Sequence, residues 1–155
     1  MSKDRKLARE VIDCNATAMR KASRRLTQLY DAALEPCGLR STQFAILAEL
    51  DYRSLQPPTM RELADALVMD RSALGHNLRP LERDKLIALD ESEEDRRRRH
   101  VVMTPRGKAK FKEAKRLWRT AQDRFIEVFG QSRARDLSAT SLAIAYNERL
   151  ATLRD

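Results

Sequence analysis

The sequence of 155 residues contains few residues that break or crosslink a chain: four Gly, five Pro and two Cys. So few turn-forming residues argue against a sandwich of many short strands and favour long helices. Two Cys cannot supply the disulfide framework of a small secreted protein. No charge-free stretch approaches the ~18 apolar residues of a membrane-spanning helix, and residues 1–10 lack the apolar segment of a secretory signal. We therefore expect a cytoplasmic, single-domain protein without a membrane segment.

Positive charge is concentrated in one part of the sequence. The chain has 31 Lys+Arg and 23 Asp+Glu, a net charge of +8, yet residues 96–116 alone hold ten basic and one acidic side chain, or +9. Residues 28–95 hold seven basic and fourteen acidic side chains, or −7. A window so rich in Arg and Lys repels itself unless an anion lies nearby, and nucleic-acid phosphate is the commonest such anion. A solvated basic surface or a lipid-facing patch is the alternative.

Long helices are predicted at both ends of the chain, because apolar or small residues recur there in steps of three and four. The expected helices and their boundaries are one uninterrupted helix over 5–35 ended by Pro36 and Gly38, a helix opened by Thr104-Pro105 and closed by Gly130, and a last helix over about 134–152. These elements leave the middle of the sequence for shorter ones.

Short elements are predicted between the long helices. They are a helix capped by Ser41, a helix opened by the capping box Thr59–Glu62, a helix from Asp70 to about Lys85, and strands at 87–89 and 100–104. The helix that begins at Asp70 is expected to continue past Pro80, because its leucines keep their spacing beyond the proline. Residues 91–99 form a charged tip between the strands. This order of elements is typical of a winged helix-turn-helix, which places one helix in the major groove and wing arginines on the neighbouring backbone or minor groove.

Three segments of the chain resemble the MarR (multiple-antibiotic-resistance) family of regulators. They are LRSTQFAILAEL, TMRELADALVMDRSALGHNLRPLERDKLI and EEDRRRRHVVMTPRGKA. The likeness extends from about Val11 to Leu150, and its motifs, which include Asp95-x-Arg97 and Val102-Met103-Thr104-x-x-Gly107, are specific in combination although each is weak alone.

The resemblance implies a fold that is mostly α with a small β-hairpin wing, in a single MarR-like domain. Its expected parts are dimerisation helices at about 5–35 and 134–153, a winged helix-turn-helix lobe at about 41–104 and a connecting helix at 105–129. It further implies a homodimer with interlocked end helices that binds double-stranded DNA at a pseudo-palindromic operator. Small molecules or oxidation often release the DNA in this family, so a ligand-responsive repressor is the leading interpretation.

The expected DNA contacts lie on the third short helix and in the wing. Matching family positions are Ser72, Ala73, Gly75, His76 and Arg79 on the helix, and Asp95, Arg97, Arg98 and Arg99 in the wing. Arg79 is long enough to reach a guanine edge or a phosphate. Gly75 costs a helix about 1 kcal/mol relative to Ala, which a closely approaching DNA backbone would explain. Arg83 is expected to pair with another side chain, and which wing arginine lies at the tip stays open.

A ligand cleft is a further hypothesis. Its candidate residues are Arg20, Tyr30, Phe44, Tyr52 and Trp118, with Arg24 nearby. The aromatic and basic side chains suit a small aromatic or acyl anion as effector. Ordinary core packing is the alternative for the aromatic residues.

Metal and nucleophilic sites find little support in the sequence. His76 and His100 are 24 residues apart with no ligand-spaced Cys, Asp or Glu beside them, and there is no glycine-rich phosphate loop. We therefore expect no metal, no cofactor and no enzyme activity. In the organic-hydroperoxide regulators that the family includes, the reactive Cys aligns with Ala16 rather than with Cys14, so oxidant sensing by Cys14 or Cys37 stays open. An intact helix would hold these two Cys roughly 30 Å apart, which excludes a disulfide within one chain.

Two other function classes remain as alternatives to a sequence-specific regulator. An architectural DNA- or RNA-binding protein could use the same basic surface, but it would show little sequence preference and uniformly salt-sensitive binding. An enzyme would show turnover without DNA. The effector, the operator sequence and the sign of regulation do not follow from the sequence.

Overall fold

The structure, a computed structural model, describes residues 3–91 and 99–151. In these ranges the helices are α1 (Lys3–Ile12), α2 (Asn15–Leu34), α3 (Ser41–Tyr52), α4 (Met60–Ala66), α5 (Arg71–Arg83), α6 (Pro105–Phe129) and α7 (Gln131–Ala145), with two 3₁₀ turns, η1 (Glu35–Cys37) and η2 (Glu148–Leu150). The strands are β1 (Ile87–Glu91) and β2 (Arg99–Met103). The mostly helical fold with one small hairpin is therefore confirmed.

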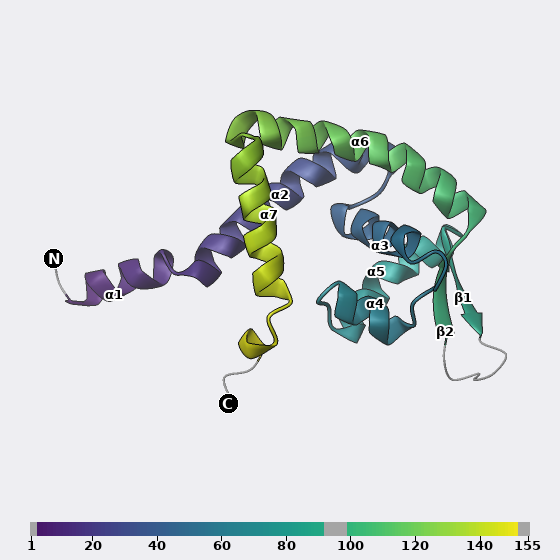
Figure 1. The fold of residues 1–155 in the computed structure, drawn as a ribbon, viewed down its shortest axis with the longest axis horizontal. Coiled ribbons are helices and arrows are strands. Elements are labelled where there is room, and N and C mark those ends of the chain that lie inside the picture. The colour runs from purple at the N-terminus through teal and green to yellow at the C-terminus, as the bar shows by residue number, and fades with distance from the viewer. Residues whose placement is uncertain (1–2, 92–98, 152–155) are drawn as a thin grey trace.

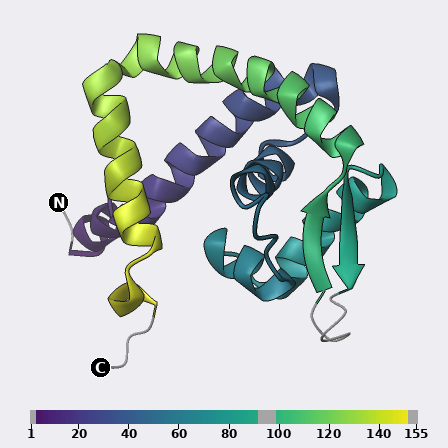
Figure 2. The same cartoon turned by 45° about the vertical axis from the view of Figure 1, so that its right-hand side comes forward.

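Two regions with different packing are visible in Figures 1 and 2. We call α1, α2, α6, α7 and η2 the frame, and residues 41–104, which contain α3, α4, α5 and the hairpin, the lobe. Long helices of the frame cross one another and enclose little, whereas the short elements of the lobe gather beneath the first half of α6 (Figure 1). The lobe therefore hangs from the frame through α6 and the α2–α3 connection.

The first helix is not continuous, which corrects the predicted single helix over 5–35. α1 ends at Ile12, and Cys14 has an extended backbone (φ −67°, ψ 153°) from which α2 begins. Asp13 and Asn15 flank this break, and their short polar side chains favour caps over helix interiors because they compete for backbone hydrogen bonds. The apolar spacing runs on across the break, so periodicity alone did not show it.

The connection from α2 to α3 fixes where the lobe begins. Pro36 lies in η1, and Gly38 has a left-handed backbone (φ 73°) that ends the turn. Arg40, not Ser41, is the N-cap residue of α3, so the predicted cap was one residue too late. The N–H of Ser41 instead donates to Oδ1 of Asp31 at 2.7 Å, because α2 and α3 meet closely enough for α2 to supply the cap.

Both helices of the helix-turn-helix begin at the N-cap residues that the sequence predicts. Thr59 and Glu62 form the reciprocal capping box of α4, and Asp70 accepts a hydrogen bond from the N–H of Ala73 at 2.7 Å to start α5. The turn between the helices closes with Val68 at φ 51°, an uncommon conformation for a β-branched residue. α5 continues through Pro80 to Arg83, as expected, because its leucines remain buried on both sides of the proline.

The hairpin is antiparallel, and β2 connects it to the rest of the lobe. Ile87 pairs with Met103 and Glu91 with Arg99, so both strands are slightly longer than predicted at the tip, while β2 ends at Met103 rather than at Thr104. The N–H of Val101 donates to the carbonyl of Pro58 at 2.8 Å, which ties β2 to the loop before α4. This attachment fixes the direction of the hairpin relative to α4 and α5.

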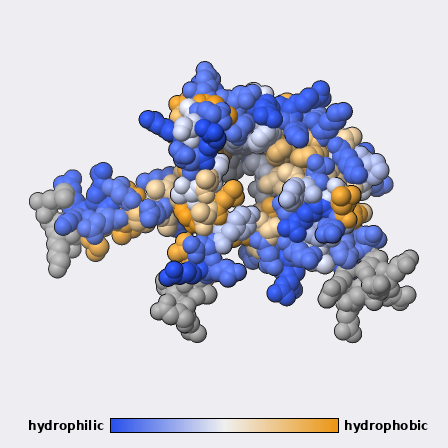
Figure 3. Space-filling model, viewed as in Figure 1, coloured by the Kyte–Doolittle hydropathy of each residue, from blue (hydrophilic) through white to orange (hydrophobic). Residues whose placement is uncertain are grey.

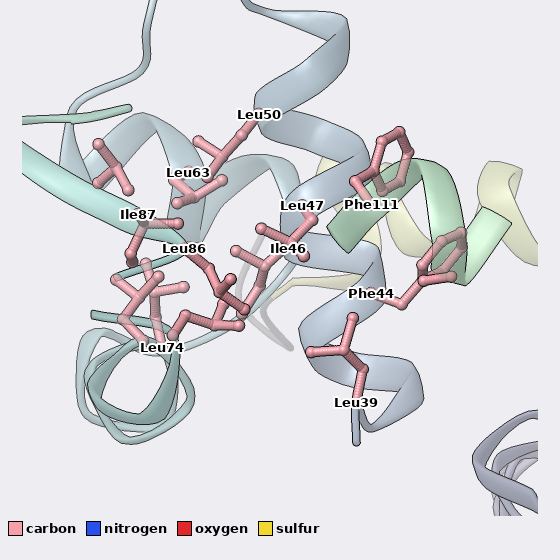
Figure 4. Close-up of a cluster of buried hydrophobic side chains, with 14 of the residues drawn as sticks. Leu39, Phe44, Ile46, Leu47, Leu50, Leu63, Leu74, Leu86, Ile87 and Phe111 are labelled. Atoms are coloured by element: carbon pink, nitrogen blue, oxygen red, sulfur yellow. The ribbon is translucent and has the colours of Figure 1, made fainter. Parts of the chain in front are cut away.

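The core lies in the lobe, around α3. Its buried side chains come from α3, α4, α5, the hairpin and α6, and those labelled in Figure 4 are Leu39, Phe44, Ile46, Leu47, Leu50, Leu63, Leu74, Leu86, Ile87 and Phe111. The ring of Phe44 stacks on Phe111 (centroids 5.3 Å apart) and on Trp118 (6.0 Å). The described residues bury no polar or charged side chain in this core, so apolar packing holds α6 to the lobe.

The start of α6 packs closely against the backbone of Lys85 and Leu86. Thr104 caps the helix by accepting from the N–H of Gly107 at 3.0 Å and donates its hydroxyl to the carbonyl of Lys85 at 2.7 Å. A Cβ atom on Gly107 would lie 2.0 Å from the carbonyl oxygen of Leu86. Only glycine fits here, so the Thr104-x-x-Gly107 motif serves the packing of α6 on the hairpin.

The last helix differs from its predicted bounds of about 134–152. Gly130 (φ 84°) ends α6 and also starts α7 at Gln131, so no linker separates the two helices. α7 ends at Ala145, and Asn147 caps the separate turn η2 by accepting from the N–H of Arg149 at 3.1 Å. As at the first helix, the apolar spacing continued across a real break in the backbone.

Candidate nucleic-acid interface

The exposed face of α5 is the first part of the interface. Ser72, His76 and Arg79 are exposed and, at spacings of four and three, project from one face of the helix. Leu74, Leu78 and Leu81 on the other face are buried in the core. Ala73 and Gly75 lie half-buried at the edge of the exposed face. The five residues predicted on this helix therefore lie together, on an element that the lobe holds rigidly.

Gly75 has no packing role within the chain. A Cβ atom added there would meet nothing within 4 Å among the described residues, unlike the Cβ of Gly107. The backbone of Gly75 is ordinary for a helix, since its φ is not positive. A glycine that lowers helix stability without a structural reason in its own fold is consistent with a surface that another molecule approaches closely.

The wing is the second part of the interface. Asp95, Arg97 and Arg98 lie outside the described residues. Arg99 starts β2, is exposed, and stands opposite Glu91 in the hairpin register. The hairpin points away from α6, with the paired residues Glu91 and Arg99 at its far end (Figure 1).

A hollow beside the hairpin contains arginines that sequence reasoning missed. It has a volume of about 600 Å³ and lies between β2, α4 and the start of α5. Arg61, Arg71 and Arg99 line it, together with Asp65, which pairs with Arg61 at 3.8 Å. Arg71 directly follows the cap of α5, a position that could have been singled out as phosphate-facing. Arg61 comes to the site only through the packing of α4 beside β2, which spacing does not show.

Acidic residues near this surface already have partners. The backbone N–H and the hydroxyl of Thr59 donate to Glu62 at 2.7 and 2.8 Å, and these hydrogen bonds lower the pKa of Glu62. Arg83 pairs with Asp84 at 3.0 Å, as expected, and this carboxylate raises the pKa of Arg83. Because Arg83 pairs with Asp84, Arg79 is the long basic side chain on the exposed face of α5 that remains for a nucleic-acid contact.

The five predicted cleft residues do not form one site, and the two that are in contact, Phe44 and Trp118, meet at the core. Tyr52 is 86% exposed at the end of α3, while Phe44 is buried in the core and Trp118 packs against it. Arg20 is exposed on α2. Tyr30 alone among the five lines a substantial groove in the described structure, so aromatic residue type was a poor guide to position.

That groove lies between α2, α6 and α7 and has a volume of about 500 Å³. Its lining is mainly apolar and includes Met19, Ala22, Leu26, Phe125, Leu137 and Leu142, with Tyr30, Gln122 and several Ser and Thr hydroxyls. The hydroxyl of Tyr30 donates to Oε1 of Gln122 at 2.6 Å, and burial raises the pKa of Tyr30. In Figure 3 orange side chains gather where α7 crosses α2.

One further contact joins the frame to the helix-turn-helix. The hydroxyl of Tyr146, just beyond α7, donates to the carbonyl of Ala66 at the end of α4, at 2.8 Å. A shallow hollow of about 550 Å³ surrounds this contact, lined by Val68 and Met69 of the turn and by residues around η2. The position of the turn before α5 is therefore linked to the end of α7.

Solved structures similar to this chain include transcriptional regulators. MosR of M. tuberculosis in complex with DNA is 34% identical over 84% of this chain and 96% of its own, with a TM-score of 0.72. The repressor CouR, solved with a 23-mer DNA duplex, is 28% identical over 88% and 95%, with a TM-score of 0.77. CouR with p-coumaroyl-CoA is 24% identical over 89% and 96%, with a TM-score of 0.77, a likeness of fold. No curated protein matches the chain.

An exposed helix of a helix-turn-helix beside a two-stranded hairpin, with four consecutive arginines where the second strand begins in the sequence, is the arrangement of a winged-helix, DNA-binding transcriptional regulator. A sequence profile of the MarR family matches residues 38–98, and MosR is similar over nearly the whole length of both proteins. The chain belongs to the MarR family of transcriptional regulators. No helix in residues 3–91 and 99–151 is long and apolar enough to cross a membrane.

Proposed function

We propose that the protein is a homodimeric, ligand-responsive repressor that binds a pseudo-palindromic operator through α5 and the wing. The observation that carries this proposal is the exposed face of α5, where Ser72, His76 and Arg79 project from a helix whose other face is fixed in the core. A helix presented in this way fits the major groove, and the hairpin beside it directs the wing arginines to the flanking backbone or minor groove. MosR and CouR, the regulators described above, were both solved with DNA.

The division of labour within each half-site follows from side-chain length and position. Arg79 reaches base edges or a phosphate, while Ser72 and His76 act at closer range, where the absence of a side chain at Gly75 lets the DNA backbone approach. Arg97, Arg98 and Arg99 of the wing, with Asp95 to orient them, supply contacts that depend less on sequence. Arg61 and Arg71 add phosphate contacts from the hollow beside the hairpin.

A second copy of the chain completes the frame in this proposal. The frame exposes a series of large apolar side chains: Leu7, Val11, Ile12, Met19, Val128, Phe129, Leu137, Leu142, Ile144, Tyr146 and Leu150. Large apolar side chains exposed in groups along helices are typical of interaction sites, and a symmetric dimer covers such faces with the same faces of its partner. Two lobes on one frame match the two halves of a palindrome.

Operator binding is tested by selection and footprinting. Purified protein is mixed with a library of random duplexes, bound duplexes are enriched at moderate salt, and the winning sequence is footprinted. We expect one protected palindrome of ~20 base pairs with half-sites about one helical turn apart. Enrichment of no sequence, with binding that depends only on salt, would support the architectural alternative. Transcription in vitro from a promoter carrying the selected site tests repression separately.

The effector is proposed to be a small aromatic or acyl compound that occupies the groove between α2, α6 and α7. The groove is mainly apolar, with Tyr30 and Gln122 as polar groups, and both helices that carry the lobe form its walls. A ligand releases DNA only if it binds the DNA-incompetent spacing of the lobes more tightly. Arg20 does not line the groove, so neutral polar groups replace it in recognition.

The groove is tested with a filled variant. Leu26→Trp should abolish release of the selected duplex by a panel of aromatic acids and acyl thioesters while leaving the duplex affinity near that of the wild type. Leu55→Trp, in an exposed loop of the lobe, is the matched control. Light scattering of both variants separates a blocked groove from a lost dimer. If the ligand concentrations that release the duplex from the wild type also release it from Leu26→Trp, the effector binds elsewhere.

A further inference from the structure

The basic window of the sequence divides between two opposite ends of the lobe. Four of the ten basic residues in 96–116 are the wing arginines 96–99, whereas the other six lie on α6. α6 runs along the end of the lobe opposite the outer ends of β1 and β2, as Figure 1 shows. The positive charge that suggested one nucleic-acid surface therefore belongs to two surfaces, and the α6 part is not used by the proposed operator contacts.

The α6 charges form a continuous stripe on the outer face of the helix. Its members, which we call the α6 stripe, are Lys108, Lys112, Lys115, Arg116 and Arg119, all exposed. At 3.6 residues per turn they fall within an arc of about 100°, roughly opposite the buried face of Phe111, Ala114 and Ala121. Hydrophilic residues cover this outer face of α6 in Figure 3.

Acidic side chains do not neutralise the stripe. Within residues 3–91 and 99–151, none of its five side chains forms an ion pair, and the guanidinium of Arg119 lies over the ring of Trp118, 5.3 Å from its centroid. The acidic residue nearest along the helix, Glu113, pairs with Lys110 at 2.9 Å, outside the stripe. Farther along α6 the usual pattern returns, with Arg124 paired to Glu127. Like charges at spacings of three and four destabilise a helix, so the stripe is unfavourable unless an anion binds it.

We infer that the α6 stripe is a second DNA-binding surface, which takes the phosphate backbone of a duplex other than the one held by α5 and the wing. The stripe spans twelve residues from Lys108 to Arg119, about 16 Å along the helix. One DNA strand places a phosphate about every 3.4 Å along the axis, so this length covers about half a helical turn, and the stripe contacts those phosphates of that half-turn that face it. A row of uniform charge suits such a regular polyanion, and its position on the other end of the lobe from the outer ends of β1 and β2 keeps it clear of the first duplex.

The consequence is that one regulator can hold two DNA segments. Contacts through Lys and Arg to phosphates are independent of sequence and strongly salt-dependent. The second segment therefore needs no operator, and the protein could bring distant DNA to its operator or pass between segments. This inference goes beyond the proposed function, although its experiment uses the duplex that the selection above provides.

The test measures bridging between two duplexes by energy transfer. Protein is saturated with a donor-labelled selected duplex, and an acceptor-labelled random duplex is titrated in from about 50 mM to about 200 mM salt. The stripe variant is Lys108→Gln, Lys112→Gln, Lys115→Gln and Arg116→Gln, which spares Arg119 on Trp118. The control with the same loss of charge is Lys21→Gln, Arg25→Gln, Arg133→Gln and Arg135→Gln, four exposed residues outside both surfaces. Circular dichroism and light scattering confirm that both variants fold and assemble.

We expect the wild type and the control to bridge, and the stripe variant to lose at least tenfold in affinity for the second duplex with a shallower salt dependence. All three should bind the first duplex with similar affinity. Arg79→Ala should show the reverse: its affinity for the first duplex falls and its affinity for the second is unchanged. Failure of operator binding is therefore distinguishable from failure of this inference. No bridging by the wild type, or equal losses in stripe variant and control, would overturn it. Binding of labelled polyglutamate but of no second duplex would also overturn it, in favour of an acidic protein partner.

Discussion

The lobe and the frame solve the problem of burying apolar surface in different ways. The lobe buries its large side chains within one chain, with Leu47, Leu63 and Leu74 fully buried. The frame contributes eleven of the fourteen exposed large hydrophobic residues in the described structure, against three in the lobe, Tyr52, Leu55 and Val68. The lobe therefore completes its core with side chains of its own and of α6, whereas the frame leaves large apolar side chains that the proposed dimer would cover. In the proposed dimer, this difference would let the spacing of the two lobes change while α5 stays fixed in its core.

The largest expected effect comes from placing a charge in the frame. Leu142→Arg puts an unpaired charge on the apolar face of α7 that we expect to be buried in the dimer, at a cost of several kcal/mol. Light scattering should then show a 17.9 kDa monomer or unfolded chain in place of a dimer of twice that mass. Leu150→Arg should act similarly at η2.

The matched substitution in the lobe is Leu55→Arg. Leu55 is 96% exposed in the loop before α4, where a charge stays in water, so this variant should remain dimeric with unchanged stability. A stable wild-type monomer at micromolar concentration, or dissociation by both substitutions alike, would contradict the contrast between the two regions.

Two glycines provide the next comparison, one at the joint of lobe and frame and one on the DNA-facing helix. Gly107→Ala forces a Cβ against the carbonyl of Leu86 and should destabilise the protein by about 1–3 kcal/mol in urea unfolding. Gly75→Ala has free space and should stabilise it by about 0.5–1 kcal/mol through helix propensity. If DNA approaches this helix closely, the same variant loses about tenfold in operator affinity, or about 1.4 kcal/mol. Unchanged affinity in Gly75→Ala would remove close approach as the reason for this glycine.

Much of the lobe could be predicted because its signals are local. Thr59, Asp70, Thr104 and Gly130 each mark an end of a helix through side-chain hydrogen bonds or backbone freedom of their own, and each was placed correctly. The leucine spacing of α5 likewise gave both its buried face and its exposed face. Such features depend on few residues, so a single sequence carries them.

The frame and the remaining site could not be predicted as well because they depend on long-range packing. Apolar spacing records which face of a helix meets a partner, and it continues across the break at Cys14 and beyond the end of α7 at Ala145. Arg61 joins the interface only because α4 packs beside β2. Aromatic character did not distinguish Phe44 in the core from Tyr52 in solvent.

Within the lobe, the recognition helix and the wing should contribute to binding in different ways. Arg79→Ala should cost ~1–3 kcal/mol per half-site on the selected operator and less on random DNA, because Arg79 reads bases. Arg97→Ala should weaken binding to any duplex and reduce the salt slope by about one phosphate contact per subunit. Fluorescence anisotropy on both duplexes at several salt concentrations measures this. Equal losses on both duplexes for both variants would contradict the division.

A smaller effect is expected where the frame caps the lobe. Asp31 of α2 is partly buried, which opposes ionisation, but hydrogen bonds from the N–H and hydroxyl of Ser41 and the charge of Arg40 prevail and lower the pKa of Asp31 below its ordinary value of 3.8. A carboxyl whose native pKa is lowered stabilises the fold above its ordinary pKa, and that contribution disappears as the pH falls through the lowered value. Asp31→Ala should therefore cost about 1 kcal/mol at neutral pH and progressively less below about pH 4.

Urea unfolding of Asp31→Ala and the wild type across this pH range checks the expectation. Asp51→Ala, an exposed carboxyl on α3, is the control and should cost little at any pH. A difference between Asp31→Ala and the wild type that does not change with pH would show that the charge of Asp31 is not what holds α3.

The smallest expected effect concerns the two cysteines, one in the frame and one beside the lobe. Cys14 is exposed at the start of α2, where its hydrogen bond with Thr17 lowers the pKa of the thiol, whereas Cys37 is buried and donates to the carbonyl of Leu34 at 3.0 Å. Native protein should therefore show one fast thiol per chain in a thiol titration, and the second only after unfolding. Because the twenty-residue α2 separates the two sulfurs, no disulfide forms within a chain. Cys14→Ser/Cys37→Ser should bind the operator like the wild type, and peroxide should release neither; release of the wild type alone would make oxidation of a thiol, rather than a ligand in the groove, the signal.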